Sequence, residues 1–324
     1  MGSGHSGTGH CPVDQDLDVN AAPAACAPYN LGLPKSLPDR VITAVSERLP
    51  ALLDVIRGAT REITLSLFRC NEKAILSELA RATARGVAVD VLVTSRVKGG
   101  EKKLKKLWAA LEEIGATVRP YTDAVVKYHA KYLVADEGPA VVGSLNFTHK
   151  CFEETCDALV VTYDPLVVSG LRQLMAADRD GRRLPENLTG RLIVGPERAR
   201  RQFTALIEGA RSCIRLIDPK LSDPDLVTLL NRRRAGGLTV EVFGSKRLGD
   251  LKSHGKIMLI DESLAVIGSL ALAALSLDFR REVAIVIDEA SAVAEVAQLF
   301  RTINAVPTAG RTGAAARQVE RHAD

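Results

Sequence analysis

The chain has 324 residues, of which 46% are hydrophobic and 25% are charged, and this composition is typical of a globular protein. No apolar run reaches the roughly 18 residues that a membrane span needs, and residues 1–20 lack the basic and then apolar regions of a signal peptide, so we expect a cytoplasmic protein. The net charge of +4 suits an anionic partner, such as a phospholipid surface or a nucleic acid.

The N-terminal residues and the cysteines predict little chemistry. Residues 1–38 are rich in Gly, Ala, Pro and Asp, which predicts a flexible N-terminal segment. His5, His10 and Cys11 lie in it, and we expect only adventitious metal binding there. The six cysteines form no Cys-x-x-Cys pair, and in a cytoplasmic protein we expect them to be reduced thiols.

Helices and strands alternate in the first half of the predicted secondary structure. Periodicity predicts a helix over 41–59, interrupted near Pro50, and a strand over 62–68. A helix follows over 71–86 and a strand over 87–94. This alternation favours βαβ units, with helices on the faces of a mostly parallel sheet.

The same order of elements returns in the second half. We predict a helix over 197–210, a strand over 212–218, a helix over 223–237 and a strand over 238–244. Gly58 and Gly209 are 151 residues apart, as are Gly86 and Gly237. Residues 99–124 predict an additional helix and short strand in the first half alone. The repeat is long enough to indicate a domain duplication.

We therefore predict a duplicated α/β unit. It has two lobes related by a pseudo-twofold axis, each with a mostly parallel or mixed sheet flanked by helices. The predicted divisions are a flexible segment (1–38), lobe 1 (39–180), a linker (181–190), lobe 2 (191–303) and a flexible tail (304–324).

One motif occurs in both halves. Residues 127–148 read KYHAKYLVADEGPAVVGSLNFT, and residues 252–273 read KSHGKIMLIDESLAVIGSLALA. Each contains His-x-Lys, an Asp five residues after the Lys, and a Gly-Ser pair that begins seven residues later. The matching residues are all 125 positions apart: His129 and His254, Lys131 and Lys256, Asp136 and Asp261, Ser144 and Ser269.

The His-x-Lys spacing predicts one shared site. Alternate residues of a strand project from the same face, so each copy directs an imidazole and an ammonium group to one place. The glycine of each Gly-Ser pair allows the backbone to approach a ligand, and the serine can donate a hydrogen bond. Two ammonium groups suit a phosphate, and two histidines on opposite sides of phosphorus can act as nucleophile and general acid. We expect this chemistry to need no metal and no cofactor.

Two further acids are candidates for assisting the histidines. Asp157 lies 28 residues after His129, and Glu282 lies 28 residues after His254. A carboxylate that accepts the Nδ1 hydrogen of a histidine fixes the tautomer and raises the basicity of the ring. Asp136 and Asp261 instead fit turns that end strands.

The paired HxKxxxxD…GSxN pattern resembles the phospholipase D superfamily, with its bacterial cardiolipin synthase-like members, over roughly residues 40–303. The resemblance implies phosphodiesterase or phosphatidyl-transfer chemistry through a covalent phosphohistidine. It implies His129 as nucleophile and His254 as general acid. The residues that it implies around the phosphate are Lys131, Lys256, Asn146, Ser144 and Ser269. It also implies a structural role for Asp136 and Asp261.

The sequence leaves the substrate open. We expect a monomer, since both motifs lie in one chain. We expect it to act on phospholipids and to be cytoplasmic, with peripheral binding to membranes. A metal-independent nuclease of the same superfamily is the alternative, because the chain is basic and lacks a membrane anchor. Ala271 replaces the second-copy equivalent of Asn146, which makes a catalytically impaired phosphate-binding module a third possibility. The basic stretch 98–108 fits an anionic surface or a solvated helix face.

Overall fold

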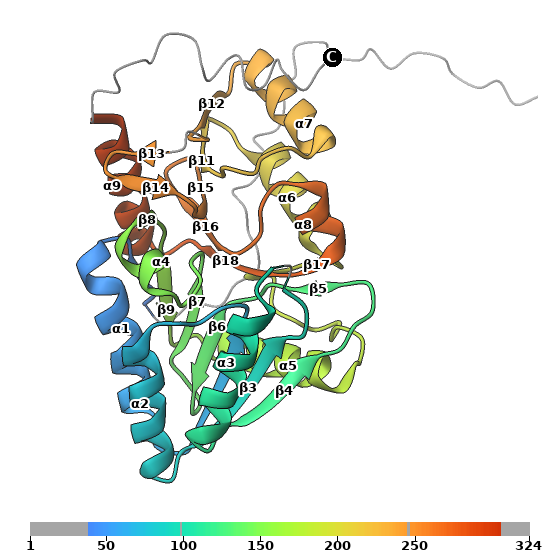
Figure 1. Cartoon of the computed structure of the whole chain (residues 1–324). Coiled ribbons are helices and arrows are strands. Elements are labelled where there is room, and N and C mark those ends of the chain that lie inside the picture. The colour runs from blue at the N-terminus through green and yellow to red at the C-terminus, as the bar shows by residue number, and fades with distance from the viewer. Residues whose placement is uncertain (1–37, 98, 245–246, 306–324) are drawn as a thin grey trace, which may run out of the picture. The chain divides into compact units, whose positions relative to one another are not determined.

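The computed structural model describes residues 38–97, 99–244 and 247–305, which form two mixed sheets flanked by helices (Figure 1). The strands of the first sheet are β1 (Arg40–Ile42), β2 (Glu62–Leu67), β3 (Ala88–Thr94), β4 (Thr117–Tyr121), β6 (Tyr132–Ala135), β7 (Ala140–Gly143) and β9 (Leu159–Thr162). Those of the second are β10 (Leu192–Val194), β11 (Cys213–Ile217), β12 (Thr239–Val242), β15 (Lys256–Ile260), β16 (Leu264–Gly268) and β18 (Val283–Ile287). The helices are α1 (Val45–Gly58), α2 (Lys73–Ala84), α3 (Glu101–Glu113), α4 (His149–Glu153), α5 (Pro165–Asp180), α6 (Ala199–Gly209), α7 (Pro224–Ala235), α8 (Ala274–Phe279) and α9 (Ala290–Ala305).

The two sheets share one topology. The first has the order β1-β9-β7-β6-β2-β3-β4, and the second has the order β10-β18-β16-β15-β11-β12. Strands β2, β3 and β4 pair in parallel, as do β11 and β12, whereas the remaining pairs in both sheets are antiparallel. The predicted duplicated α/β class is confirmed in its mixed-sheet form. The helix and strand predicted only for the first half are α3 and β4.

Three hydrophobic clusters explain how the sheets are covered. One cluster lies between the outer face of the first sheet and helices α1, α2 and α3. A second lies between the second sheet and helices α6 and α7. The third combines the opposite faces of both sheets with α5 and α9, and it contains Tyr132 of β6 and Ile257 of β15. Because this third core is common to both halves, their packing fixes the position of one half against the other.

The structure differs from the sequence-based expectation at the first helix. Residues 40–42 form a strand that pairs with β9, and α1 continues through Pro50 without interruption. Proline removes one backbone donor, and the carbonyl left without it belongs to the exposed residue Ser46, where water can replace the hydrogen bond.

Several predictions fall on residues beyond the described ranges. His5, His10 and Cys11, with the rest of residues 1–37, lie outside them, as do residues 306–324 of the predicted tail. The lobe and linker boundaries stay a prediction. Among the described helices, none combines the length and the apolar character that crossing a membrane requires.

Candidate active site

Two short pairs of strands connect the halves at the repeated motif. Strand β5 (Lys127–Tyr128) pairs with β17 (Arg280–Arg281), and β14 (Leu251–Ser253) pairs with β8 (Thr155–Cys156). β14 also pairs with β13 (Arg247–Leu248). Strands β5 and β14 each lead directly into a motif histidine, and β8 and β17 each lead into an acid of the other half. The pairing therefore brings each histidine next to the acid of the opposite half.

The spacing had predicted that His-x-Lys lies within one strand, but the motif is divided between two elements. His129 lies between β5 and β6, and His254 lies between β14 and β15, where the chain passes from a connecting strand into a main sheet. Histidine and lysine still converge: Lys131 Nζ lies 3.0 Å from His129 Nδ1.

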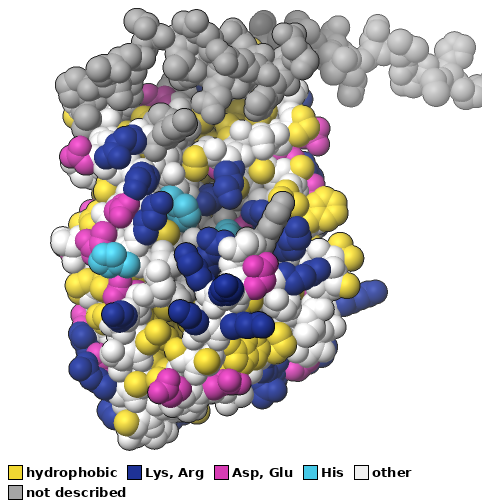
Figure 2. Space-filling model, viewed as in Figure 1, with side chains coloured by type: hydrophobic (Ala, Val, Ile, Leu, Met, Phe, Trp, Pro, Cys, Tyr) yellow, Lys and Arg dark blue, Asp and Glu magenta, His cyan; other side chains and the backbone are white. Residues whose placement is uncertain are grey.

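Both histidines line one open pocket of about 780 Å³. The other lining residues are Phe68, Arg69, Ser95, Arg96, Val97, Glu101, Lys127, Tyr128, Asn146, Lys220, Lys256 and Arg280. Figure 2 shows Lys and Arg side chains gathered around histidine side chains on this face of the molecule. The pocket thus combines two imidazoles with a surplus of positive charge, which is the environment that an anionic phosphate requires.

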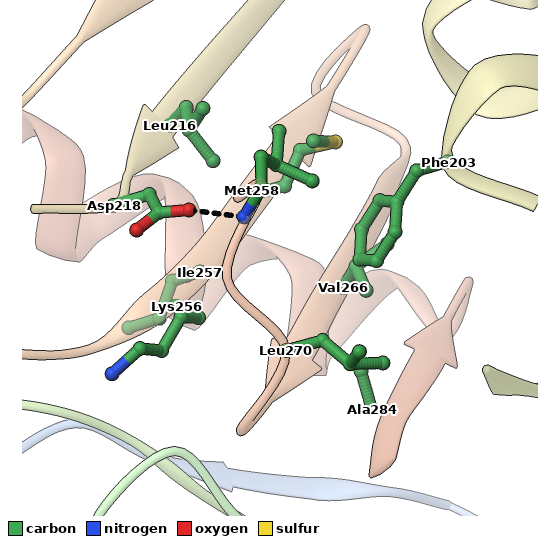
Figure 3. Close-up of a pocket in the computed structure, with 10 residues that line it drawn as sticks. Phe203, Leu216, Asp218, Lys256, Ile257, Met258, Val266, Leu270 and Ala284 are labelled. Atoms are coloured by element: carbon green, nitrogen blue, oxygen red, sulfur yellow. Dashed lines mark hydrogen bonds between the residues drawn. The ribbon is translucent and has the colours of Figure 1, made fainter. Parts of the chain in front are cut away.

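The two motif lysines are buried and held in the same way. Lys131 Nζ donates to the carbonyl oxygen of His129, and Lys256 Nζ donates to that of His254, both at 2.6 Å. Burial lowers the pKa of Lys131 well below its ordinary value, although the carboxylate of Glu282 opposes this effect. The stem of Lys256 lines a small apolar cavity, and its ammonium group points away from the apolar side chains (Figure 3).

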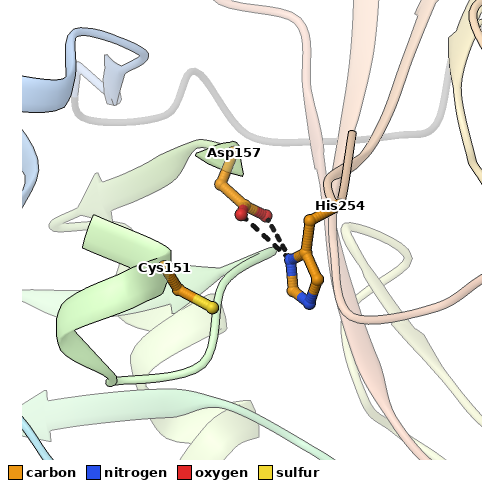
Figure 4. A group of neighbouring side chains, drawn as sticks. All are labelled: Cys151, Asp157 and His254. Carbon is orange, nitrogen blue, oxygen red and sulfur yellow. Dashed lines mark hydrogen bonds and ion pairs between the residues drawn. The ribbon is translucent and has the colours of Figure 1, made fainter. Parts of the chain in front are cut away.

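His254 contacts the first-half acid. Its Nδ1 lies 2.9 Å and 3.1 Å from the two carboxylate oxygens of Asp157 (Figure 4). Ser144 Oγ and Thr155 Oγ1 donate to the same carboxylate, at 2.6 Å and 2.5 Å. Burial alone raises the pKa of Asp157, but the charges of His254 and Lys256 and these hydrogen bonds hold it below its ordinary value.

His129 forms an ion pair with the second-half acid, although the paired oxygen of Glu282 makes no hydrogen bond within the described residues. Its Nδ1 pairs with Glu282, whose side chain is buried and also accepts a hydrogen bond from Ser276. Burial raises the pKa of Glu282, and the charge of Lys131 opposes the rise. Burial lowers the pKa of His129 well below its ordinary value, and the cations Lys131, Lys256, Arg280 and Lys220 add to this effect. The ring of His129 is therefore neutral at physiological pH, with Nε2 unprotonated if Nδ1 carries the hydrogen.

The predicted phosphate-binding residues separate into two groups. Asn146 lines the pocket. Ser144 and Ser269 are fully buried and do not line it: Ser144 donates to Asp157, and Ser269 donates to the backbone oxygen of Val283 at 3.3 Å. Their placement does not support the phosphate contact that we expected, since each hydroxyl donates its hydrogen bond within the protein.

The Gly-Ser glycine and Ala271 also have structural explanations. A Cβ atom on Gly268 would lie 2.3 Å from the Cα of Ala284, so glycine permits close pairing of β16 with β18 and not approach to a ligand. Ala271 is buried, and its N–H donates to Ser276 Oγ at 3.0 Å. The position equivalent to Asn146 therefore belongs to the interior of the second half.

Asp136 and Asp261 lie away from the pocket lining. Asp136 accepts hydrogen bonds of 2.8–2.9 Å from the backbone N–H groups of Thr60, Arg61 and Glu62. Asp261 likewise accepts from the N–H groups of residues 211–213. Both residues have positive φ, 45° and 53°, in tight turns. These contacts fix the start of β2 and of β11 and support the structural role that the resemblance implies.

One group of potential metal ligands occurs among the described residues. Ligand atoms of Cys151, Asp157 and His254 lie within 4.8 Å of one another (Figure 4). The oxygens of Asp157 already accept hydrogen bonds from Ser144, Thr155 and His254, and a metal ion would have to replace them. The donor set therefore fits hydrogen bonding better than metal coordination.

Sequence reasoning missed several pocket residues. Arg69 and Lys220 both line the pocket and are 151 residues apart, so the offset of the helix glycines could have identified them. Phe68 contacts the ring of His129, with centroids 4.3 Å apart. Arg280, Thr155 and Ser276 carried no local signal, because their roles depend on pairing between the halves.

A duplicated mixed-sheet fold, with the histidines of two His-Lys pairs at one pocket, defines the class of protein. The family model described as "Cardiolipin synthase, PLD-like domain" matches residues 52–179 and 228–304, which is more than half of the chain. The chain therefore belongs to this phospholipase D-like family, as the repeated motif had indicated.

Individual relatives agree with the family. The chain is 27% identical over 129 residues to cardiolipin synthase A of Pseudomonas entomophila (strain L48), a match that covers 40% of this chain and 27% of that protein. It is 26% identical over 163 residues to phospholipase D of Rickettsia bellii (strain RML369-C), covering 50% of this chain and 79% of that one. The match thus spans about a quarter of the cardiolipin synthase.

Two solved structures share the fold. Polyphosphate kinase from Porphyromonas gingivalis superposes with a TM-score of 0.68 at 19% identity, covering 87% of this chain and 50% of that one. Phosphatidylserine synthase from Haemophilus influenzae Rd KW20 superposes with a TM-score of 0.65 at 12% identity, covering 83% and 87%. At these identities the likeness is one of fold.

Proposed function

We propose that the protein is a monomeric phosphodiesterase of phospholipase D type, which hydrolyses or transfers the phosphatidyl group of phospholipids through a covalent phosphohistidine. The observation that carries the proposal is the convergence of His129, His254 and Lys256 on one pocket, with Lys131 in contact with His129 and a carboxylate of the opposite half next to each ring. The matching relatives named cardiolipin synthase and phospholipase D support the phospholipid assignment.

The first chemical step uses His129 as nucleophile. Glu282 holds the Nδ1 hydrogen of His129, so Nε2 presents its lone pair to phosphorus. As the Nε2–P bond forms, the bond from phosphorus to the leaving oxygen breaks, and His254 transfers its Nε2 proton to that oxygen. Lys131 and Lys256 offset the charge on the remaining phosphate oxygens, and Asn146 contributes an amide donor.

The second step reverses these roles. His254, now neutral at Nε2, takes a proton from water or from an alcohol, and the oxygen attacks phosphorus. The P–N bond breaks and its electron pair returns to His129. Water gives hydrolysis and an alcohol gives transfer. Asp157 keeps the His254 ring in place through Nδ1 in both steps. Because all of these groups belong to the chain, activity should survive excess EDTA.

Exposed apolar side chains close in sequence to two pocket cations favour a lipid surface over nucleic acid. The exposed residue Val125 lies two residues before Lys127 of β5, and the exposed residue Phe279 lies directly before Arg280 of β17. Lys127 and Arg280 are opposite each other in the β5–β17 pair. Leu275 of α8 is also exposed, one turn before Phe279. This combination with the pocket cations Lys127 and Arg280 matches the chemistry of an anionic membrane. The apolar side chains would insert into the membrane, and the cations would bind its head groups.

The lipid assignment is tested by binding. Vesicles that contain anionic phospholipid should bind the protein more tightly than single- or double-stranded DNA at matched ionic strength. The Phe279→Ser variant should weaken vesicle binding and leave DNA binding unchanged. Tighter binding of DNA, unaffected by Phe279→Ser, would instead favour the metal-independent nuclease, for which the cationic face in Figure 2 is the supporting observation.

The covalent mechanism is tested by trapping. In His254→Ala, a phosphodiester with an activated leaving group needs no general acid for the first step, while the second step lacks its base. We expect a phosphoryl adduct on the peptide that contains His129, detected by mass spectrometry at neutral or alkaline pH.

Two controls sharpen the trapping experiment. His149→Ala, at an exposed histidine outside the pocket lining, should turn over normally and accumulate no adduct. An adduct on His254 in His129→Ala, with none on His129 in His254→Ala, would reverse the two roles. Absence of turnover and of adduct in the wild-type protein, with retained phosphate binding, would identify the impaired phosphate-binding module instead.

A further inference from the structure

The pocket carries more positive charge than one phosphodiester requires. Six lining residues are cationic and one, Glu101, is acidic; the cations are Arg69, Arg96, Lys127, Lys220, Lys256 and Arg280. Behind the pocket, the buried acids Asp157, Glu282 and Asp218 offset Lys131 and part of this charge. A phosphodiester has a single negative charge, so cations remain without a counterpart when it is bound.

Some of these cations are committed to the protein itself. The Arg96 guanidinium donates to the backbone oxygens of Asp123 and Ala124, at 2.5 Å and 2.8 Å, and so holds the loop before β5. Lys256 donates to the carbonyl oxygen of His254. These groups shape the pocket and the reacting centre.

Lys220 and Arg280 are not committed in this way. The ammonium group of Lys220 makes no ion pair with the part of the chain that the structure describes, and Arg280 reaches only to 4.0 Å from Glu282. Burial lowers the pKa of Lys220, and the charges of Lys256 and Arg280, which line the same pocket, lower it further by repulsion. An anion placed among them would relieve this repulsion.

The backbone positions of both residues are fixed. Lys220 follows β11, and its N–H donates to the buried carboxylate of Asp218 at 2.8 Å. Arg280 lies opposite Lys127 in the β5–β17 pair. Both charges act on the ring of His129. The two cations lie on segments of the second half and line the same pocket as the proposed nucleophile.

We propose that Lys220 and Arg280 form a subsite for a second phosphate group, next to the phosphate that His129 attacks. This inference rests on the proposed function and narrows its substrate class to compact bisphosphates. The exposed apolar side chains of Val125 and Phe279, close in sequence to the pocket cations Lys127 and Arg280, favour one kind of bisphosphate, a phospholipid whose head group carries a phosphate of its own.

The first experiment measures binding alone, so its outcome does not depend on turnover. Inorganic phosphate and methylenediphosphonate are titrated calorimetrically into the full chain at one ionic strength. The wild-type protein should bind the bisphosphonate roughly tenfold more tightly or better, because the second group adds charge-assisted contacts. Lys220→Gln and Arg280→Gln should each remove most of this preference while phosphate itself still binds.

Two matched variants separate a subsite from general attraction. Lys103→Gln changes the net charge equally at an exposed position on α3 that does not line the pocket, and it should keep the full preference. Arg69→Gln removes the cation at the position that corresponds to Lys220 in the first half, and it should reduce the preference for the bisphosphonate less than Lys220→Gln does. Equal affinity of the wild-type protein for both probes, or equal losses in all these variants, would overturn the proposal.

The source of the second phosphate is resolved by three further arms. Short-chain phosphatidylglycerol phosphate should bind more tightly than short-chain phosphatidylglycerol, and Lys220→Gln should abolish the difference. If methylenediphosphonate shows the Lys220-dependent preference but the two lipids bind equally, the subsite stands and its ligand is a free bisphosphate. If Lys220→Gln weakens the binding of a thymidine oligonucleotide and of no other probe, the cations belong to a nucleic-acid binding site and the bisphosphate subsite is wrong.

Discussion

Both halves of the chain contribute a histidine to one pocket, but the acid next to each histidine has different surroundings. On the side of His254, Asp157 accepts hydrogen bonds from Ser144 and Thr155 as well as from the ring, and its pKa is held low. On the side of His129, the longer side chain of Glu282 has Ser276 as its additional donor, and burial raises its pKa.

This difference shows how a duplicated site can divide two roles. A carboxylate that stays ionised keeps a fixed negative charge beside the ring that must gain and lose a proton, which suits His254. A neutral ring surrounded by cations suits nucleophilic attack, which is the proposed role of His129. The amide of Asn146, present only in the first half, reinforces the asymmetry.

The sharpest way to break the comparison is to replace each carboxylate by its amide. Glu282→Gln and Asp157→Asn should each lower kcat by up to about 10⁴-fold, because an amide no longer fixes the Nδ1 tautomer of its histidine. With an activated leaving group, rapid-quench measurements should find slow adduct formation in Glu282→Gln and slow adduct breakdown in Asp157→Asn. Identical kinetic defects in both steps would mean that the halves do not divide the roles.

The lysines test whether the halves serve one site at all. Lys131→Met and Lys256→Met should each reduce kcat on a p-nitrophenyl phosphodiester by roughly 10²–10³-fold, since each removes a charge that stabilises the transition state. The double variant should lose much less than the product of the two factors, because groups that act as a unit are non-additive. Multiplicative losses would indicate two independent sites.

A smaller effect is expected in the pH dependence. The cation Lys220 contributes to the lowered pKa of His129, so the nucleophile stays unprotonated to lower pH than an ordinary histidine. Lys220→Gln removes one positive charge, which should raise that pKa and move the acidic limb of kcat/KM to higher pH. Lys252→Gln, at a lysine paired with Glu154 outside the pocket lining, is the control and should leave the limb in place. A shift in the opposite direction would contradict the neutral-nucleophile assignment.

The smallest effect should be shared equally by both halves. Asp136→Asn and Asp261→Asn should each lower the free energy of unfolding by about 1–3 kcal/mol, because an amide cannot accept all the N–H groups that the carboxylate binds. Denaturant titration at pH 7 measures this loss. A much larger cost in one half would show that the two turns are not equivalent.

The same aspartates predict a pH dependence of stability. Burial opposes ionisation of Asp136, but the N–H groups of Glu62, Thr60 and Arg61 lower its pKa to about 2. A carboxyl with a lowered folded pKa contributes stability above its unfolded pKa of about 4 and loses that contribution as pH falls toward 2. The wild-type Tm should therefore fall more steeply than that of Asp136→Asn over this interval.

The family, the fold class and the two His-Lys pairs could be predicted from the sequence, because the duplication left the same residue spacing in both halves. It did not reveal which acid contacts which histidine, since that depends on β5–β17 and β8–β14, strands of only two or three residues. The position of Ser144 behind Asp157 was equally hidden. A hydroxyl next to a glycine predicts a ligand contact as readily as a buried one, and only tertiary packing distinguishes them.

The crossed strands have a consequence for how such a site can change over time. In a symmetric pair of identical chains, every substitution appears on both sides of the shared pocket, so an improvement for one chemical role is imposed on the other. Once both halves belong to one chain, each side can change alone. The glutamate and the aspartate, like Asn146 and Ala271, are differences that only such a covalently joined pair can hold, and the β5–β17 and β8–β14 pairs keep the two diverging halves in register.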